Sequence, residues 1–491
     1  MTHSPMGASD SPAGSVRRLR EAHAHLPALG RSMEMLSLEG VTSRRQALEM
    51  LRDEARRVAA RRASSPSGTA WVQAWGARVQ SWDDPRWPTR EELSAIGLAG
   101  DGLGGKAGSE PIPVAVLSFD FHAAAGSDRA MELAGLGNGA PDPEGGVIVR
   151  DSTGEATGLC LEAAAKKVWN AAPGPGPDDG PRLVKNAVEH LRSMGFVEVH
   201  DLLSPGWLGP ALAAMDDRGE LPVDVVLFAP LDPDHVREPG DALEAQHTSA
   251  NATGGWARAR VRLGGGKIFA DGTLNSATAW MLEPYAKPMP GYPRGRPNWS
   301  TDQLRAMMSR GLALDVQVAV HAIGDGAVRG VLDAWELALR ERGRSRRSGT
   351  AAGSGGAAGF GGSGGSARGL LRIEHAELID ERDVPRFEEL GAIASVQPCH
   401  LVADVDVLLR ELPHRLHRVL PLRELIDAGL EPGTGLIFGS DVPIVRANPE
   451  DSILAAVERR RRGDGPERAI AMAQAITSEE AWAAFGLGRG A

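Results

Sequence analysis

The chain has 491 residues, of which 24% are charged, with a formal net charge of −10 and a pI of about 5.8. This length suits several domains or one large α/β barrel with a sizeable core. The acidic balance argues against a nucleic-acid-binding surface and a polybasic membrane patch, and no run reaches the ~18 apolar residues of a membrane span. Two cysteines, Cys160 and Cys399, are too few for a disulfide framework, so we expect a cytoplasmic protein.

Residues 1–20 form a polar N-terminal segment without the apolar stretch of a secretory signal. We therefore place the fold in residues 21–491. From there on, strand-like runs alternate with helical patterns, which is typical of βα units and a parallel sheet. Runs such as VDVVLFA are almost wholly apolar, as expected of strands that are covered on both faces.

A count of eight strands accounts for this alternation. We expect the strands to end near His25, Asp201, Ala229, Ala270, His321, His375, Gln397 and Ser440. Eight βα units predict an α/β fold of the (β/α)8 TIM-barrel type. In such barrels the active site lies at the carboxyl ends of the strands.

Two long segments fall outside the strand count. Residues 30–180 separate the first predicted strand from the second and follow the carboxyl end of a strand, where barrel active sites form. We interpret them as a capping insertion that serves as a lid or substrate-binding subdomain. Residues 344–369 are rich in Gly, Ser and Ala, and we expect a flexible linker there, on the opposite face of the barrel.

Six side chains at or near the predicted strand ends have the chemistry of metal ligation or proton transfer: His23, His25, Lys267, His321, His375 and Asp441. His23 and His25 are two positions apart in a strand, so both side chains face the same side. Imidazole nitrogens and a carboxylate oxygen suit Zn²⁺ and neighbouring divalent ions. Taken alone, Asp441 could equally cap a helix, and Lys267 could be an ordinary surface lysine.

The order His-x-His, Lys, His, His, Asp resembles the amidohydrolase superfamily of metal-dependent hydrolases. Further phrases are similar to the amidohydrolase family 3 branch, which includes N-substituted formamide deformylase-like enzymes: FADGTLNSATAWMLEPY, HAIGDGAV, RIEHAEL, ASVQPCH and FGSDVPI. The likeness covers the chain from about Glu21 to about Gly486.

The resemblance implies a site for one or two divalent metal ions, with Zn²⁺ as the expected ion. It also implies that Lys267 is carboxylated by CO₂ and that its carbamate bridges two metals. The reaction would be hydrolysis of a non-peptide carbon–nitrogen bond by metal-activated water, with Asp441 as general base. An N-acyl or N-formyl amide is the expected small-molecule substrate.

Four further residues are candidates for substrate binding. His122 lies in the insertion, in a phrase similar to the family's DxHxA, where the histidine approaches the substrate. His200 and His400 stand near the predicted ends of two strands at the same mouth, and Trp75 would shape an apolar pocket. Each of the four also fits a packed structural residue.

Two features depart from the family pattern. Members usually carry a small β-sandwich built from residues before His-x-His and after the last barrel helix, and we expect both halves to be missing here. The first strand carries Arg17, Arg18, Arg20 and Glu21 where apolar residues and an Asp are usual, which conflicts with burial unless the charges are paired. We expect either a strand of only a few residues or a sequence that begins downstream of the true start.

Three interpretations of function stay open at this point. The first is the amide hydrolase described above. The second is a mononuclear deaminase or cyclic-amide hydrolase that uses only His23, His25, His321 and Asp441. The third is a non-catalytic, degenerate barrel that binds a small molecule or a partner. A homodimer is compatible with all three.

Overall fold

The computed structural model describes residues 18–64, 70–99, 110–119, 122–143, 146–174, 176–233, 240–288, 291–347 and 367–487. Within these ranges eight parallel strands form one sheet, and neighbouring strands follow the chain order. They are β1 (Leu19–Ala24), β8 (Phe196–Leu202), β9 (Asp224–Pro230), β10 (Val261–Phe269), β11 (Gln317–Ala322), β12 (Leu371–His375), β13 (Ile393–Val396) and β14 (Leu436–Phe438). The largest difference from a predicted strand end is that between Ser440 and Phe438.

The chain after β14 returns to β1 and closes the barrel. The amide of Asp441 donates a hydrogen bond to the carbonyl of His23 at 2.7 Å, and the amide of His25 donates to the carbonyl of Val442 at 2.9 Å. Ala24 and Val442 form a parallel bridge at the same place. The predicted (β/α)8 barrel is therefore confirmed.

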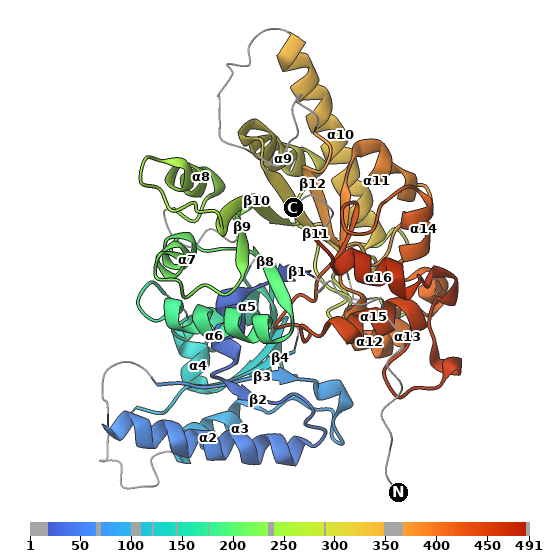
Figure 1. The fold of residues 1–491 in the computed structure, drawn as a ribbon. Helices are drawn as coiled ribbons and strands as arrows, with labels where there is room; N and C mark the ends of the chain where they lie inside the picture. The colour runs from blue at the N-terminus through green and yellow to red at the C-terminus, as the bar shows by residue number, and fades with distance from the viewer. Residues whose placement is uncertain are drawn as a thin grey trace, which may run out of the picture.

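Helices surround the barrel strands (Figure 1). Helix α6 shows why they form: its apolar residues recur every three or four positions and make one buried face. Helix α9 begins with a capping box, in which Ser300 and Gln303 satisfy each other's backbone amides. The helices of the barrel are α1 (Leu26–Ser32), α6 (Gly180–Ser193), α7 (Leu208–Asp217), α8 (Leu243–Asn251), α9 (Thr301–Leu314), α10 (Asp325–Arg347), α11 (Val384–Leu390), α12 (Pro398–Ala403), α13 (Val405–Glu411), α14 (Leu422–Asp427), α15 (Pro449–Glu458) and α16 (Ser478–Phe485).

The barrel interior contains both apolar and charged side chains. A small buried cluster comprises Leu202 from β8, Val226 and Phe228 from the neighbouring strand β9, and Ala319 from β11. Arg372 and Glu374 are also completely buried inside, and they come from alternate positions of β12. Alternate strand residues face the same side, so both point toward the barrel axis.

The segment between β1 and α6 forms a second sheet, with strand order β2-β3-β4-β5-β7-β6. Figure 1 shows this insertion in blue to cyan, below the barrel strands. Helices α2 and α3 pack on one face of the sheet, and α4 and α5 pack on the other. Its elements are β2 (Leu36–Ser37), α2 (Arg44–Ser64), β3 (Val72–Ala77), α3 (Arg90–Ala99), β4 (Val114–Ser118), β5 (Ala123–Gly126), α4 (Asp128–Leu133), β6 (Gly146–Arg150), β7 (Ala156–Glu162) and α5 (Ala163–Ala171).

The charged first strand fits because its charges are bonded. Strand β1 has six residues and begins at Leu19. Arg20 donates a hydrogen bond to the carbonyl of Gly433 at 3.0 Å. Glu21 is completely buried and accepts hydrogen bonds from the amides of His23 and Ser440 and from the Ser440 hydroxyl, at 2.8–3.0 Å. Pairing of this kind offsets the free energy of burying charge.

Three further predictions concern the family's β-sandwich, the Gly/Ser-rich linker and membrane-spanning segments. Every strand named within the described ranges belongs to the barrel sheet or to the sheet of the insertion, so those ranges hold no third sheet. The predicted linker at 344–369 lies for its larger part outside the described residues, because α10 ends at Arg347 and the description resumes at 367. Among the described helices, none is long and apolar enough to cross a membrane.

Candidate metal centre

Two histidines and one aspartate meet at the carboxyl end of the barrel. His23 belongs to β1, His25 follows it, and Asp441 follows β14. The Oδ1 atom of Asp441 lies 3.3 Å from Nε2 of His23 and 3.0 Å from Nε2 of His25. His23 and Asp441 are buried, whereas the side chain of His25 is 21% exposed. One carboxylate oxygen therefore faces two imidazoles at a partly open position.

His375 and His321 join the cluster from β12 and β11. The ring of His375 lies 5.0 Å from that of His23 and 4.5 Å from that of His321, measured between ring centroids. One possible ligand atom from each of His23, His375 and Asp441 lies within 4.8 Å of the others, which is close enough to hold one ion. The structure thus brings five of the six predicted ligands into one group of rings and carboxylate.

Lys267, the sixth predicted ligand, extends from β10 into the same interior. It is completely buried, and its Nζ atom has no hydrogen-bond partner among the described residues. Burial lowers the pKa of its ammonium group to about 8, even though the nearby carboxylates of Glu374 and Asp441 act in the opposite direction. A buried amine without a hydrogen-bond partner is rare in a folded protein and needs an explanation.

The donor set fits a divalent metal ion. Burial lowers the pKa of His23 to about 4, so its imidazole is neutral near pH 7, as a metal ligand must be. Nδ1 of His375, like Nζ of Lys267, is buried without a hydrogen-bond partner in the described part of the chain. The two imidazole nitrogens and one carboxylate oxygen that converge from His23, His375 and Asp441 match the ligand types that Zn²⁺ prefers.

Two of these residues have strained backbones. His375 has φ of 68° and Asp441 has φ of 64°, in the left-handed region that side chains with a Cβ rarely adopt. Each such residue costs about 1–3 kcal/mol and persists only where the surrounding structure enforces it. The left-handed backbone at the end of β12 and after β14 directs the side chains of His375 and Asp441 into the barrel mouth.

The buried pair Arg372 and Glu374 supports His23. Oε2 of Glu374 lies 2.7 Å from Nδ1 of His23, and the guanidinium of Arg372 donates to Oε1 of the same carboxylate. Burial would raise the pKa of Glu374, but Arg372 and His23 together hold it well below its usual range. The ionised carboxylate fixes the proton of His23 on Nδ1, which leaves Nε2 available to a metal.

We therefore expect Glu374→Gln to lower metal affinity by ~10–100-fold, the usual effect of losing a carboxylate behind a histidine ligand. The amide keeps the size of the side chain but removes the charge that orders His23. The dissociation constant should be measured by competition with a chelator. Glu388→Gln, which alters an exposed carboxylate paired with Arg368, is the matched control. An unchanged dissociation constant in Glu374→Gln would show that this contact does not tune the site.

Gly439 leaves the room that β1 needs beside β14. A Cβ atom at this position would lie 2.5 Å from the amide nitrogen of His23 and 2.7 Å from Oε1 of Glu21. Neither neighbour can move away easily, because one is backbone and the other belongs to a carboxylate that accepts three hydrogen bonds, two of them at Oε1. Only glycine allows the two strands to approach so closely.

Gly439→Ala is accordingly expected to destabilise the protein by about 1–3 kcal/mol, as overpacking usually does, and to weaken metal binding by displacing His23. Thermal unfolding and metal titration measure the two effects. Gly137→Ala is the control, because a Cβ there meets no atom within 4 Å. If both variants unfold at the same temperature as the parent protein, the close approach at Gly439 does not contribute to stability.

His400 lies beside the cluster, as predicted from its strand end. Its ring centroid is 5.6 Å from that of His375, and its Nδ1 is 3.6 Å from Oε1 of Glu377. Burial lowers the pKa of His400, but the hydrogen bond and charge of Glu377 and the charge of Asp441 outweigh it and raise the pKa to about 9.

Of the other three predicted substrate-binding residues, His200 and Trp75 are bonded or packed away from the cluster, and His122 lies at the edge of the insertion. Both ring nitrogens of His200 are bonded inside the barrel, where Nδ1 accepts from Arg372 at 2.7 Å and Nε2 donates to Glu198 at 3.0 Å. Trp75 is 8% exposed and packs in the core of the insertion. His122 is partly exposed at the edge of the insertion, where its charge acts on His321.

Motif order alone does not single out Arg372, Glu374 or Glu377. All three stand inside the phrase RIEHAEL, and the first two alternate with Ile373 along a buried strand. Charges at alternate positions of an otherwise apolar parallel strand are the signal that could have found them, since such residues face the barrel axis. Their partners depend on distances across the barrel, which the strand pattern does not contain.

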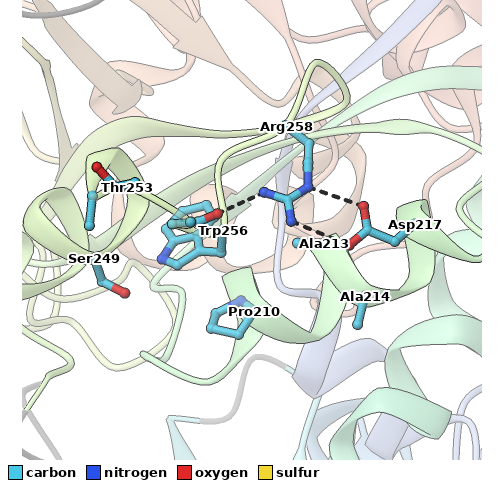
Figure 2. Close-up of a pocket in the computed structure, with 11 residues that line it drawn as sticks. Pro210, Ala213, Ala214, Asp217, Ser249, Thr253, Trp256 and Arg258 are labelled. Atoms are coloured by element: carbon cyan, nitrogen blue, oxygen red, sulfur yellow. Dashed lines mark hydrogen bonds and ion pairs between the residues drawn. The ribbon is translucent and has the colours of Figure 1, made fainter.

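A pocket of about 420 Å³ lies away from this centre, between α7 and the segment after α8. Figure 2 shows its wall, where Trp256 and Pro210 flank the ion pair of Arg258 and Asp217. Nε of Arg258 lies 3.1 Å from Oδ1 of Asp217. None of the residues that line it is a candidate ligand, so this pocket is separate from the proposed chemistry.

The sequence profile of the amidohydrolase family matches residues 19–490, nearly the whole chain. The chain belongs to the amidohydrolase family. As an amidohydrolase it is an enzyme, a metal-dependent hydrolase that acts on carbon–nitrogen bonds other than peptide bonds. The predicted family is confirmed, and the interpretation as a non-catalytic barrel is not needed.

Relatives of this amidohydrolase include proteins from a plant and a bacterium. It is 27% identical over 458 residues to protein LONG AFTER FAR-RED 3 of Arabidopsis thaliana, across 90% of this chain and 68% of that protein. It is 23% identical over 430 residues to N-substituted formamide deformylase of Arthrobacter pascens, across 84% of this chain and 68% of that protein. A solved structure of an uncharacterized metal-dependent hydrolase from Pyrococcus horikoshii OT3 has the same fold, with a TM-score of 0.65 and 24% identity, and the match covers 95% of this chain and 78% of that one.

Proposed function

We propose that this amidohydrolase cleaves the amide bond of an N-acyl or N-formyl amine, releasing a carboxylic acid and an amine. The observation that carries the proposal is the approach of Asp441 to two imidazoles beside the unpartnered amine of Lys267. Similarity to an N-substituted formamide deformylase supports the N-formyl class of substrate. The partly exposed His25 marks the side from which a small molecule would enter.

Six residues would hold one or two divalent ions, for which we propose Zn²⁺: His23, His25, Lys267, His321, His375 and Asp441. A bound ion supplies two things, a lower pKa for water and polarisation of the substrate carbonyl. Lys267 is proposed to contribute as its carbamate, because an ammonium group would repel a cation. Its lowered pKa favours the neutral amine that reacts with CO₂.

Asp441 is the proposed general base. It accepts one proton of the attacking water while the oxygen of that water bonds to the amide carbon. The carbon–nitrogen bond then breaks, and Asp441 passes the proton to the leaving nitrogen. His400 and His122 are proposed to contact the substrate at the mouth, with residues 30–180 acting as the lid. His200 and Trp75, bonded or packed elsewhere, would act on substrate only through their neighbours.

We also propose a reducing, cytoplasmic setting, because Cys160 and Cys399 are both buried free thiols. Burial raises the pKa of both thiols, that of Cys160 to about 12, so neither is a nucleophile at neutral pH. A homodimer remains a prediction, which light scattering of the purified protein would test.

The function is tested by metal analysis of purified protein followed by a screen of N-formyl and N-acyl amines. We expect one or two zinc or similar ions per chain and release of amine from at least one class. Protein stripped by a chelator should be inactive and should recover when Zn²⁺ is returned. Protein that binds no divalent metal would contradict the site, and metal-loaded protein that cleaves neither class would contradict the substrate.

A further inference from the structure

His122 and Glu162 lie side by side at the edge of the insertion. His122 directly precedes β5, and Glu162 is the last residue of β7, which pairs with β5 in antiparallel fashion. The amide of Glu162 donates to the carbonyl of His122 at 2.8 Å. Their side chains are also joined, with Nδ1 of His122 2.7 Å from Oε2 of Glu162. One backbone hydrogen bond and one side-chain contact therefore hold His122 and Glu162 in place relative to each other.

Glu162 also has an unusual backbone. Its φ of 53° and ψ of −123° lie outside the regions that residues with a Cβ prefer, at the point where β7 turns into α5. Such strain costs about 1–3 kcal/mol and clusters at functional positions. A glycine would adopt this conformation without strain, yet the position holds a carboxylate.

The second oxygen of Glu162 connects the insertion to the barrel. Oε1 accepts a hydrogen bond from the hydroxyl of Thr278 at 3.3 Å, and Thr278 belongs to the loop that follows β10. The same hydroxyl accepts from the amide of Thr273 at 3.0 Å. Position 272 must be glycine here, because a Cβ would lie 1.9 Å from that hydroxyl oxygen.

The loop leads directly to the metal centre. The carbonyl of Gly272 lies 3.0 Å from Nε2 of His321, one of the proposed ligands. A continuous set of short contacts therefore runs from His122 through Glu162 and the loop to His321. One polar pair of the insertion is thus tied to the loop that contacts a proposed ligand.

The carboxylate of Glu162 stays ionised in this position. Burial acts to raise its pKa, but His122, Ser276 and the charge of Lys166 outweigh burial and lower the pKa to about 2. An ionised carboxylate accepts a stronger hydrogen bond from an imidazole than a neutral group would. The carboxylate can therefore hold the His122 ring in one orientation and one tautomer.

We propose that Glu162 is a positioning residue, which holds the imidazole of His122 in one orientation and one tautomer beside the loop that leads to the metal centre. The proposal rests on the proposed function for its kinetic consequences, but not for the contact between the two side chains. Carboxylates behind histidines serve this purpose in many active sites, where they set the orientation and tautomer of the ring.

Kinetics of a double-mutant cycle give the first test. We expect Glu162→Ala to lower kcat/KM by ~10–100-fold, His122→Ala by at least as much, and the double variant by no more than His122→Ala alone. Metal content should not change in any of them. Added imidazole should partly restore His122→Ala but not the double variant. Glu155→Gln, an exposed carboxylate in the turn between β6 and β7, is the control. Additive losses, or rescue that does not need Glu162, would overturn the proposal.

A second test does not depend on turnover. In protein labelled with ¹⁵N-histidine, the Nδ1 proton of His122 should give a low-field NMR signal that disappears in His122→Ala and shifts upfield in Glu162→Gln, a variant of the same size. An unchanged signal in Glu162→Gln would overturn the proposal. If wild-type protein cleaves no amide, the proposed function fails while this NMR result still decides whether Glu162 positions His122.

Discussion

Asp441→Asn should lower kcat by ~10² or more while leaving metal bound, which is the usual size of general acid–base catalysis. Asparagine has the same shape and keeps one oxygen that can face His23 and His25, so the site should still assemble. It lacks the second basic oxygen that would take the proton from water. The acidic limb of the pH–rate profile should vanish as well, because that limb reports a group that must be deprotonated.

The measurement is steady-state kinetics together with metal analysis on the same preparation. Asp427→Asn, an exposed carboxylate on α14 that pairs with Arg423, is the matched control and should behave like the parent protein. A variant with full metal content and near-parental kcat would place the general base elsewhere.

Lys267→Ala should remove about one metal ion per chain and lower turnover by ~10² or more. A carbamate that bridges two ions would be lost, and each ion supplies several kcal/mol of charge stabilisation to the reaction. Alanine also leaves a cavity where the buried side chain was. Short carboxylic acids such as acetate or propionate should enter that cavity and partly restore activity by supplying bridging oxygens.

Metal content per chain and activity at increasing acetate concentration measure these effects. Lys185→Ala is the control, because Lys185 is a half-exposed lysine on α6 that pairs with Glu220. Unchanged metal content in Lys267→Ala would remove this residue from the ligand set. The enzyme would then fit the mononuclear arrangement, in which His23, His25, His321 and Asp441 suffice.

The barrel could be predicted from the sequence because strand signals are local. An apolar run followed by a polar side chain marks where a strand ends, and every predicted end falls close to an observed one. His-x-His in β1 and the single histidines of β11 and β12 could be placed for the same reason. Carboxyl ends of parallel strands meet at one face of a barrel, so these residues must converge.

The residues that surround and orient the candidate ligands could not be predicted, because their contacts depend on which strands face each other across the barrel. His200 stands at the end of a strand, as His321 does, yet it faces Arg372 and Glu198 and is bonded at both nitrogens. Trp75 likewise lies in a strand, but the core between the insertion's sheet and helices α4 and α5 buries it. Nothing local in either stretch distinguishes a residue at the mouth from one in a core.

The junction of β1 with the segment after β14 has a consequence for how the enzyme is made. Glu21 and Ser440, which are bonded to each other, stand 419 positions apart. Nearly all of the polypeptide must leave the ribosome before the two halves of the site can meet, and such long-range pairing is slow to form. Any chain released before β14 has been synthesised lacks Asp441. Because Asp441 is the proposed general base, we expect the growing polypeptide to lack hydrolytic activity until the barrel is complete.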